Sequence, residues 1–279
     1  MMETMPERPS LSPRRLAIMN RIRVNAPVMM LKDRLLEKFS AWGINPELGL
    51  DADVLDNLPQ LELKDMARRI DAAGLRPTVH GPFFDLSPGA IDPLVLEITR
   101  RRFSQALELA ALFSPEHIVF HANYDKKRNE SYRDVWLEIS LGTWRPLARR
   151  ARELGFRIVL ENVYEETPEE IKPLLDGLTA EDVGLCFDIG HAAAFSRADI
   201  LDWLEALEPH LAALHLHDNH GDRDEHLPIG WGSIDFKAVF KWLASLDARP
   251  QITLEPHEES HLWPSLAALE SLWPWPVES

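Results

Sequence analysis

The stretch VGLCFDIGHA, residues 183–192, carries the pattern that decides the fold. Its first half, Val183–Phe187, is a short apolar run, which is typical of a fully buried β-strand. Asp188 follows that run directly, and His191 comes three residues later. Polar residues directly after a buried strand are typical of a barrel that carries its functional groups at the carboxyl ends of its strands. Cys186, the single cysteine of the chain, reads as a small buried hydrophobe; it excludes an internal disulfide and favours a reducing compartment.

Similar apolar runs recur along the chain and alternate with longer amphipathic stretches. This alternation, without a low-complexity linker, predicts repeated βα units. The predicted strands are Leu16–Met19 (with a continuation after Arg23 left open), Glu47–Leu50, Arg76–Val79, His117–Phe120, Arg157–Leu160, Val183–Phe187, Leu211–Leu216 and Gln251–Leu254. The predicted helices, with apolar residues recurring at three and four, are about Leu31–Trp42, Leu61–Ala73, Leu94–Phe113, Ser131–Leu154, Pro168–Leu175, Ala198–Leu207, Phe236–Leu246 and Pro264–Leu272.

Strands and helices in this number and order predict a single (β/α)8 TIM barrel of the α/β class, in preference to a doubly wound sheet. The length of 279 residues, 45% of them hydrophobic, suits one such barrel or two smaller domains, and one barrel is the simpler interpretation. We assign residues 15–279 to the barrel and residues 1–14 to an N-terminal extension.

The charge of the chain excludes some partners. Lys and Arg total 30 against 45 Asp and Glu, a formal net charge of −15, so the surface field repels polyanions and we expect no nucleic acid partner. The N-terminus lacks an apolar core of signal-peptide length, and no run approaches the roughly 20 apolar residues that span a bilayer. We therefore expect a cytoplasmic protein with no membrane partner and a small-molecule substrate; the oligomeric state is left open.

The residues at the carboxyl ends of the predicted strands face the active site in this architecture. Six consecutive strands end in an imidazole or a carboxylate. Strand by strand, these residues are His80; His121; Glu161; Asp188 with His191; His215 with His217, Asp218, Asp224 and His226; and Glu255.

Each of these residues alone has an ordinary structural role. A single histidine after a strand is more often a hydrogen-bonded structural residue, and a single Asp or Glu is commonly a helix cap or a salt-bridge partner. Several carboxylates at one barrel mouth are costly unless cations compensate them, because like charges oppose mutual ionisation. No Lys or Arg stands at these strand ends. The combination therefore predicts bound divalent metal ions.

Six segments together resemble the xylose isomerase-like TIM-barrel superfamily, which includes sugar and sugar-phosphate isomerases and epimerases and the endonuclease IV branch (AP endonuclease family 2). The resemblance runs in order from about residue 76 to 257, and the Asp-x-x-His and His-x-His-Asp elements are specific in combination. The segments are VHGPF (Val79–Phe83), VFHANYD (Val119–Asp125), VLENV (Val159–Val163), GLCFDIGHA (Gly184–Ala192), LHLHDNHGDRDEHLPIGWGSIDF (Leu214–Phe236) and TLEPH (Thr253–His257).

The resemblance implies a set of metal ligands. The isomerases and epimerases use one metal on four ligands, which correspond to Glu161, Asp188, His215 and Glu255. The endonuclease IV branch uses nine ligands for three zinc ions, and each has a match here: His80, His121 and Glu161; Glu161, Asp188, His215 and Glu255, with Glu161 bridging; and His191, Asp224 and His226. The resemblance places His215 in the ligand position and leaves His217 near the substrate. Zinc is therefore the expected metal, up to three ions, with manganese or cobalt as alternatives.

Two kinds of chemistry make different demands on these residues. An epimerase needs two carboxylates flanking one carbon, and Glu161 and Glu255 are its candidate catalytic acid and base. A multinuclear hydrolase also needs His80, His121 and the loop ligands, because closely spaced cations activate water and hold phosphate oxygens. The full ligand set favours the hydrolase; the epimerase and a non-catalytic metal-binding or ligand-binding barrel stay as alternatives.

The acidic surface is a departure from endonuclease IV and favours a phosphodiester in a small metabolite. The stretch HGPFFDLSPGA (His80–Ala90) resembles the cobamide-remodelling phosphodiesterase branch, which implies a cobamide as one substrate. Lys126 and Arg128, after His121, are candidate phosphate contacts, with a solvated loop as the alternative. Trp231, between two glycines, is a candidate stacking partner for a planar ligand group, with packing over the loop as the alternative.

Overall fold

Eight parallel strands close into a barrel in the computed structural model, which describes residues 10–247 and 249–277. Neighbours in the chain are neighbours in the sheet, and β1 pairs with both β2 and β8. The strands are β1 (Arg23–Pro27), β2 (Pro46–Gly49), β3 (Thr78–His80), β4 (His117–His121), β5 (Arg157–Glu161), β6 (Gly184–Asp188), β7 (Leu211–Leu216) and β8 (Gln251–Leu254).

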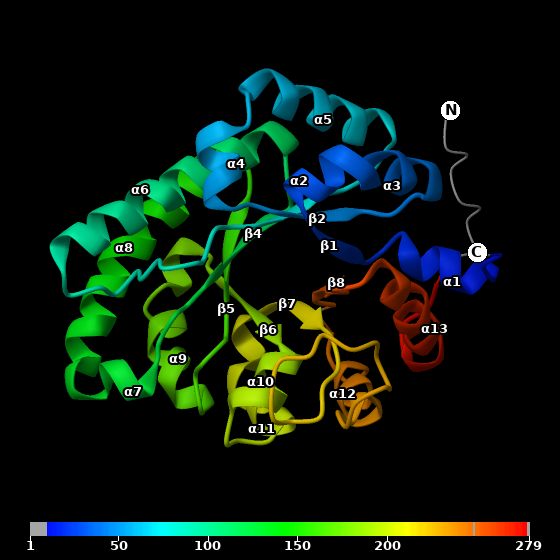
Figure 1. Ribbon diagram of the computed structural model, residues 1–279. Coiled ribbons are helices and arrows are strands. Elements are labelled where there is room, and N and C mark those ends of the chain that lie inside the picture. The colour runs from blue at the N-terminus through cyan, green and yellow to red at the C-terminus, as the bar shows by residue number, and fades with distance from the viewer. Residues whose placement is uncertain (1–9, 248, 278–279) are drawn as a thin grey trace.

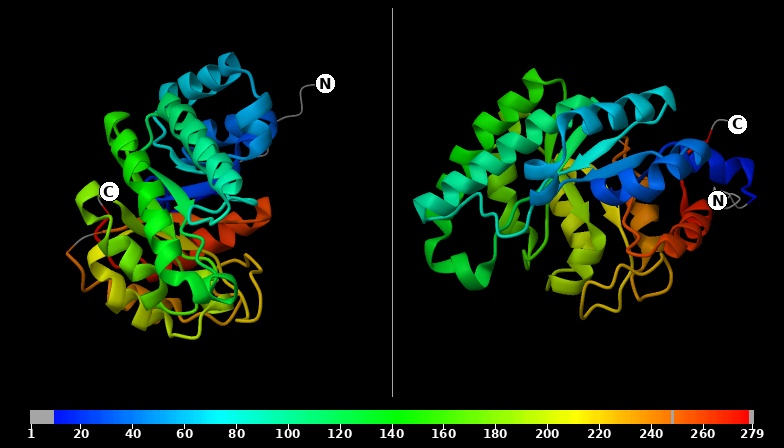
Figure 2. Two further views of the ribbon diagram at one scale, coloured as in Figure 1. Left: turned by 90° about the vertical axis from the view of Figure 1, so that its left-hand side faces the viewer. Right: turned by 45° about the horizontal axis from the view of Figure 1, so that its top comes forward.

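Helices surround this barrel in all three views (Figures 1 and 2). The α-helices are α1 (Pro13–Met19), α2 (Val28–Met30), α3 (Leu36–Trp42), α4 (Ala52–Asn57), α5 (Gln60–Ala72), α6 (Pro93–Ala110), α7 (Lys126–Asn129), α8 (Arg133–Glu153), α9 (Pro168–Asp176), α10 (Ile189–Phe195), α11 (Ile200–Leu207), α12 (Phe236–Leu243) and α13 (Leu262–Leu272). A π-helical turn, Leu31–Leu35, joins α2 to α3. Short 3₁₀ turns are Ala111–Phe113, Glu130–Tyr132, Thr179–Glu181, Glu208–His210 and Glu259–His261.

Side chains that alternate along the strands form two separate hydrophobic clusters, one between the barrel and its helices and one inside the barrel. In β4, Ile118 and Phe120 belong to the large cluster between the barrel and its helices. Val119 belongs instead to a small separate cluster with Val159, Cys186 and Ala213 from the next three strands. Because side chains alternate with a period of two, the residues two positions further along share the inner face with this small cluster. The side chains of His121, Glu161, Asp188 and His215 therefore point towards the inside of the barrel.

The structure confirms the predicted (β/α)8 barrel and corrects its first strand. Leu16–Met19 is not a strand but the second half of helix α1, and the first strand is Arg23–Pro27. The Ser12 side chain caps this helix by accepting a hydrogen bond from the Arg15 N–H at 3.0 Å, and Pro13 occupies the first helical turn. Both residues stabilise a helix start, which outweighs the strand-like apolar run.

The N-terminal part of the described chain packs beside the C-terminal helix. Helix α1 contacts α13, and an ion pair joins Arg15 to Glu270 at 2.6 Å. The blue and red ends of the ribbon consequently lie next to each other in Figure 1. Residues 1–9 of the predicted extension lie outside the described residues. Within the described ranges, no helix is both long and apolar enough to cross a membrane.

His117, at the amino end of β4, should make the fold sensitive to acid. It is 1% exposed, its ring nitrogens have no hydrogen-bond partner among the described residues, and burial lowers its pKa to about 3. The folded protein thus keeps His117 neutral, while the unfolded chain takes up a proton below about pH 6.5. Its contribution to stability is present above pH 6.5 and is lost as the pH falls towards 3.

We therefore expect the variant His117→Asn to lose stability less steeply with acidification. One group accounts for at most about 1.4 kcal/mol per pH unit, so the slope of the unfolding free energy between pH 6.5 and 4 should fall by roughly 1 kcal/mol per unit. Denaturant unfolding at several pH values measures that slope. An unchanged slope would show that the unfolded and folded states protonate His117 alike.

Candidate metal centre

The barrel brings the predicted ligands together at one mouth. His80, His121, Glu161 and Asp188 are the last residues of β3, β4, β5 and β6. His215 is the fifth residue of β7, and Glu255 directly follows β8. The sheet register pairs His121 with Glu161 and Asp188 with His215, so adjacent strands place their ligands side by side.

Four residues form what we call the central group: Glu161, Asp188, His215 and Glu255. The Nδ1 atom of His215 lies 3.1 Å from Glu255 Oε1, 3.6 Å from Glu161 Oε1 and 3.9 Å from Asp188 Oδ2. His215 and Asp188 are fully buried, and Glu161 is 1% exposed. One nitrogen and three carboxylates thus converge on a small volume.

Glu161 also faces a pair of histidines outside the central group. Its Oε2 atom lies 3.0 Å from His80 Nε2 and 3.5 Å from His121 Nε2. Its Oε1 atom lies 3.1 Å from His191 Nδ1 and 3.6 Å from His215 Nδ1. The two oxygens of one carboxylate therefore face two different sets of imidazoles.

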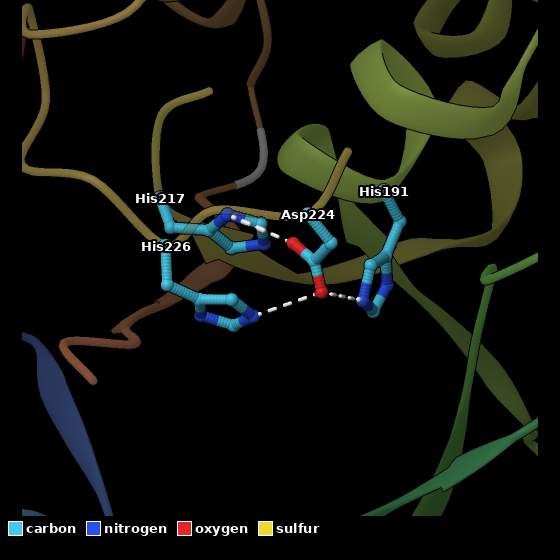
Figure 3. A group of neighbouring side chains, drawn as sticks. All are labelled: His191, His217, Asp224 and His226. Carbon is cyan, nitrogen blue, oxygen red and sulfur yellow. Dashed lines mark hydrogen bonds and ion pairs between the residues drawn. The ribbon is translucent and has the colours of Figure 1, made fainter. Parts of the chain in front are cut away.

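A further cluster, which we call the outer group, consists of His191, His217, Asp224 and His226 (Figure 3). One ligand atom from each lies within 4.8 Å of all the others. Asp224 Oδ2 is 3.0 Å from His226 Nε2 and 3.4 Å from His191 Nε2, and its Oδ1 is 3.5 Å from His217 Nδ1. The His217 ring stacks on the His226 ring with centroids 3.8 Å apart.

Backbone carbonyls orient three of these histidines. The Nδ1 atoms of His80, His191 and His226 lie 2.9, 3.0 and 3.0 Å from the carbonyl oxygens of Gly81, Asn162 and Glu255. A carbonyl can only accept, so each Nδ1 must carry the proton and donate it. In the neutral imidazole, the form that binds a cation, the lone pair is then on Nε2, which faces Glu161 or Asp224. This arrangement is typical of histidines that bind metal ions.

The surroundings act differently on the members of the site: neighbouring negative groups outweigh burial and raise the pKa of His80, His191, His215 and His226. Burial lowers the pKa of His121 to about 3, which keeps that imidazole neutral. Burial opposes ionisation of Glu161, but the neighbouring imidazoles, His215 foremost, outweigh it and hold its pKa well below the usual range. Burial likewise opposes ionisation of Asp188, but the neighbouring His191 outweighs it and lowers its pKa. Ionised carboxylates and a neutral imidazole are the forms that bind cations.

A second observation also favours divalent metal ions: several buried polar atoms of the site have no hydrogen-bond partner among the described residues. Asp188 Oδ2, His215 Nδ1 and Asp224 Oδ1 have no hydrogen-bond partner among the described residues. A buried polar atom without a partner costs roughly 1–3 kcal/mol, which a cation at that position removes. Imidazole nitrogens with carboxylate oxygens form a donor set that suits zinc.

Asp218 holds the loop that carries part of the outer group. Fully buried after β7, it accepts hydrogen bonds from backbone N–H groups at 2.8–3.2 Å. The donors are Asn219, Gly230, Gly232 and Ile234. A Cβ at Gly232 would collide with the Asn219 carbonyl and the Asp218 carboxylate, so the loop backbone packs tightly here. Asp218 therefore positions residues 219–234.

The remaining predicted residues lie around this centre. Lys126 begins α7, with its Nζ 3.7 Å from Glu166 Oε2 and 3.6 Å from Glu170 Oε1. Arg128 is mostly exposed and lies 3.3 Å from Asp125. Trp231 is 57% exposed, with its ring edge-on to His261. Their role in substrate binding stays a prediction.

Two residues near the ligands, His257 and Glu47, are not among the site residues predicted from the sequence. His257, after β8, stacks on His226 with ring centroids 3.6 Å apart, and burial lowers its pKa to about 4. It stands in the quoted segment TLEPH, two residues after Glu255, so proximity in sequence could have indicated it. Glu47 is fully buried in β2, and its Oε1 lies 3.1 Å from His215 Nε2. Because Glu47 is the second residue of β2 and not its last, the rule based on strand ends does not predict it.

The fold and the site together define a TIM-barrel protein with a buried centre of histidines and carboxylates suited to divalent metal ions. The chain belongs to the xylose isomerase-like TIM-barrel family, whose match covers residues 41–273.

Known proteins resemble the chain over most of its length. The protein TTHB071 from Thermus thermophilus, solved after soaking with ZnCl₂, is 30% identical, with a TM-score of 0.78 over 91% of this chain and 98% of that one. A D-tagatose 3-epimerase-like protein is 24% identical, with a TM-score of 0.77 over 90% and 97% of the two chains, and shows the shared fold. MJ1311 of Methanocaldococcus jannaschii is 31% identical over 184 residues, and the match spans 63% of each protein.

Proposed function

We propose that the protein is a metal-dependent hydrolase that holds more than one divalent cation and cleaves a phosphodiester in a small molecule. The position of Glu161 carries the proposal. Its Oε2 faces His80 and His121, and its Oε1 faces His215 of the central group. A carboxylate between two ligand sets suits a bridge between two cations, which a site with one cation does not require.

The residues divide into three sets of ligands under this proposal. Glu161 would be shared by the pair His80 and His121 and by the central group. The outer group would hold a third ion through His191, Asp224 and His226. When bound, the cations supply positive charge for phosphate oxygens and lower the pKa of a water towards about 7. The chain itself orients the ligands, through the carbonyls of Gly81, Asn162 and Glu255, and buries the centre.

Features around the mouth favour a small substrate with an apolar or planar part. Exposed aromatic side chains follow three of the strands: Phe84 after β3, Tyr164 after β5 and Trp231 after β7, at 77%, 51% and 57% exposed. Aromatic faces bind planar groups and the apolar faces of sugars. The net charge of −15 opposes a long polyanion. A cobamide stays one candidate substrate, on the resemblance of the stretch His80–Ala90 alone.

Sugar isomerisation or epimerisation is the second candidate. Several solved structures with this fold are described as sugar epimerases, including 3-keto-D-glucoside 4-epimerase and D-psicose 3-epimerase. These comparisons support this candidate more directly than hydrolysis. Glu161 and Glu255 both adjoin His215 Nδ1, at 3.6 and 3.1 Å, so two carboxylates are available to move a proton. Burial, with Asp188 and Glu161 nearby, raises the pKa of Glu255, which favours its proton-carrying form.

Metal analysis combined with two assays separates the candidates. We expect protein purified without chelators to hold about three zinc ions per chain, to cleave bis(p-nitrophenyl) phosphate, and to lose cleavage on chelation and regain it with zinc. One manganese or cobalt ion, with uptake of solvent deuterium into a ketose that is lost in Glu255→Gln, would establish the epimerase instead. Folded protein that binds no metal would contradict both.

A further inference from the structure

The partner of His215 on the side away from the central group is a carboxylate. Glu47 Oε1 lies 3.1 Å from His215 Nε2, and both residues are fully buried. Glu47 lies in β2, while His215 lies in β7, so the contact crosses the inside of the barrel.

Side chains from three other strands surround the Glu47 carboxylate. The hydroxyls of Thr78 and Thr253 donate to its Oε2 at 2.9 and 3.0 Å, and the Asn25 amide donates to its Oε1 at 3.2 Å. These donors stabilise the ionised carboxylate, which can then only accept hydrogen bonds.

His215 is oriented differently from the other histidines of the centre. His80, His191 and His226 each point Nδ1 at a backbone carbonyl and Nε2 at the carboxylates of the site. His215 points Nδ1 at Glu255 and the rest of the central group. Neither ring nitrogen of His215 makes a hydrogen bond among the described residues, and Glu47 Oε1, at 3.1 Å, is the carboxylate oxygen that lies beside its Nε2.

We propose that Glu47 is a positioning residue of the metal centre. When His215 binds a cation through Nδ1, its Nε2 carries the proton, and the Glu47 carboxylate 3.1 Å away is placed to accept that proton in a hydrogen bond and so to fix the tautomer that directs the Nδ1 lone pair at Asp188, Glu161 and Glu255. Acceptors of this kind on ligand histidines orient the ring and raise its basicity. The inference rests on the proposed function in one respect, that His215 binds a cation.

Glu47 could instead be a ligand itself, since it forms a compact group with His215 and Glu255. The hydrogen bonds argue against this. Both Glu47 oxygens already accept from Asn25, Thr78 or Thr253, whereas Asp188 Oδ2, the corresponding atom of the central group, accepts none among the described residues. A carboxylate surrounded by donors is built to hold its neighbours in place.

The test compares zinc binding in the wild type and in Glu47→Gln. Glutamine keeps the size of the side chain, but its amide can donate to Nε2 and stabilise the opposite tautomer. We expect roughly 10- to 100-fold weaker zinc affinity at one site, with an unchanged number of zinc ions at saturation. Competition with a chromophoric chelator measures the affinity. Thr253→Val, which removes a donor to Glu47 but keeps the carboxylate, is the matched control and should change the affinity only a few-fold.

Nitrogen NMR of histidine-labelled, zinc-loaded wild type gives a readout that needs no variant. His215 should show a protonated Nε2 and a zinc-bound Nδ1; the opposite assignment would overturn the inference. Unchanged affinity in Glu47→Gln would overturn it too, and the loss of one zinc ion at saturation would make Glu47 a ligand and refute the positioning role. A wild type that binds no zinc would refute the proposed function instead.

Discussion

Replacing Glu161 by glutamine should abolish phosphodiester cleavage and leave the protein with fewer bound cations. Glu161 is the residue whose two oxygens face both His80 with His121 and His191 with His215. An amide keeps the volume but has no charge, and only one of its two terminal atoms can bind a cation. We expect kcat/KM to fall by roughly 10³-fold or more, because charge at the reacting phosphate would no longer be held in place.

Metal content and kinetics have to be measured on the same preparations. Glu97→Gln, on the exposed face of α6, is the matched control and should cleave and bind metal like the wild type. Circular dichroism establishes that Glu161→Gln is folded. If it is folded, fully loaded and fully active, Glu161 is not a bridging ligand.

The largest effect on stability should follow from Asp218→Ala. The change removes the acceptor for the backbone N–H groups of residues 219, 230, 232 and 234, and each buried donor without a partner costs roughly 1–3 kcal/mol. Water will reach part of the loosened loop, so we expect a net loss of about 3–5 kcal/mol. For a chain of this size that lowers Tm by about 10 °C.

The same variant should also lose a cation, because the loop carries Asp224 and His226 of the outer group. Thermal unfolding of the metal-free protein separates the effect on stability from the effect on binding. Asp222→Ala is the matched control, since this carboxylate lies in the same loop with its side chain 72% exposed. A Tm for Asp218→Ala equal to that of the control would show that Asp218 does not hold the loop.

The strand-end positions of the central group can be predicted from the sequence because they depend only on local rules, whereas the resemblance to the family predicts that these four residues form one group. A short apolar run predicts a buried strand, and the next polar residue falls at the barrel mouth. Parallel register then brings the ends of adjacent strands together, as for His121 and Glu161. An error of one or two residues in a predicted strand boundary does not change which polar residue follows the apolar run, so the predicted position at the barrel mouth stays the same.

Other features depend on more than one strand or on competing signals. Glu47 meets His215 across the closed barrel, and no spacing in the chain reports a contact between β2 and β7. Helix α10 is not among the predicted helices, because the spacing of Asp188 and His191 predicts ligands and does not by itself predict a helix. The Asp188 side chain also caps that helix, accepting from the His191 N–H at 2.6 Å. The same separation of three residues suits both roles, because it spans nearly one helical turn and so places Asp188 beside the His191 N–H and the two side chains on the same side of the helix.

The distribution of the predicted ligands along the chain has a consequence for when the site can form. His80, His121 and Glu161 come from consecutive strands, but the central group also needs Glu255, which follows β8, the strand that pairs with β1 to close the barrel. A nascent chain that lacks β8 therefore has no complete central site. The four side chains of the central group therefore come together only when the last strand has been added and the barrel has closed.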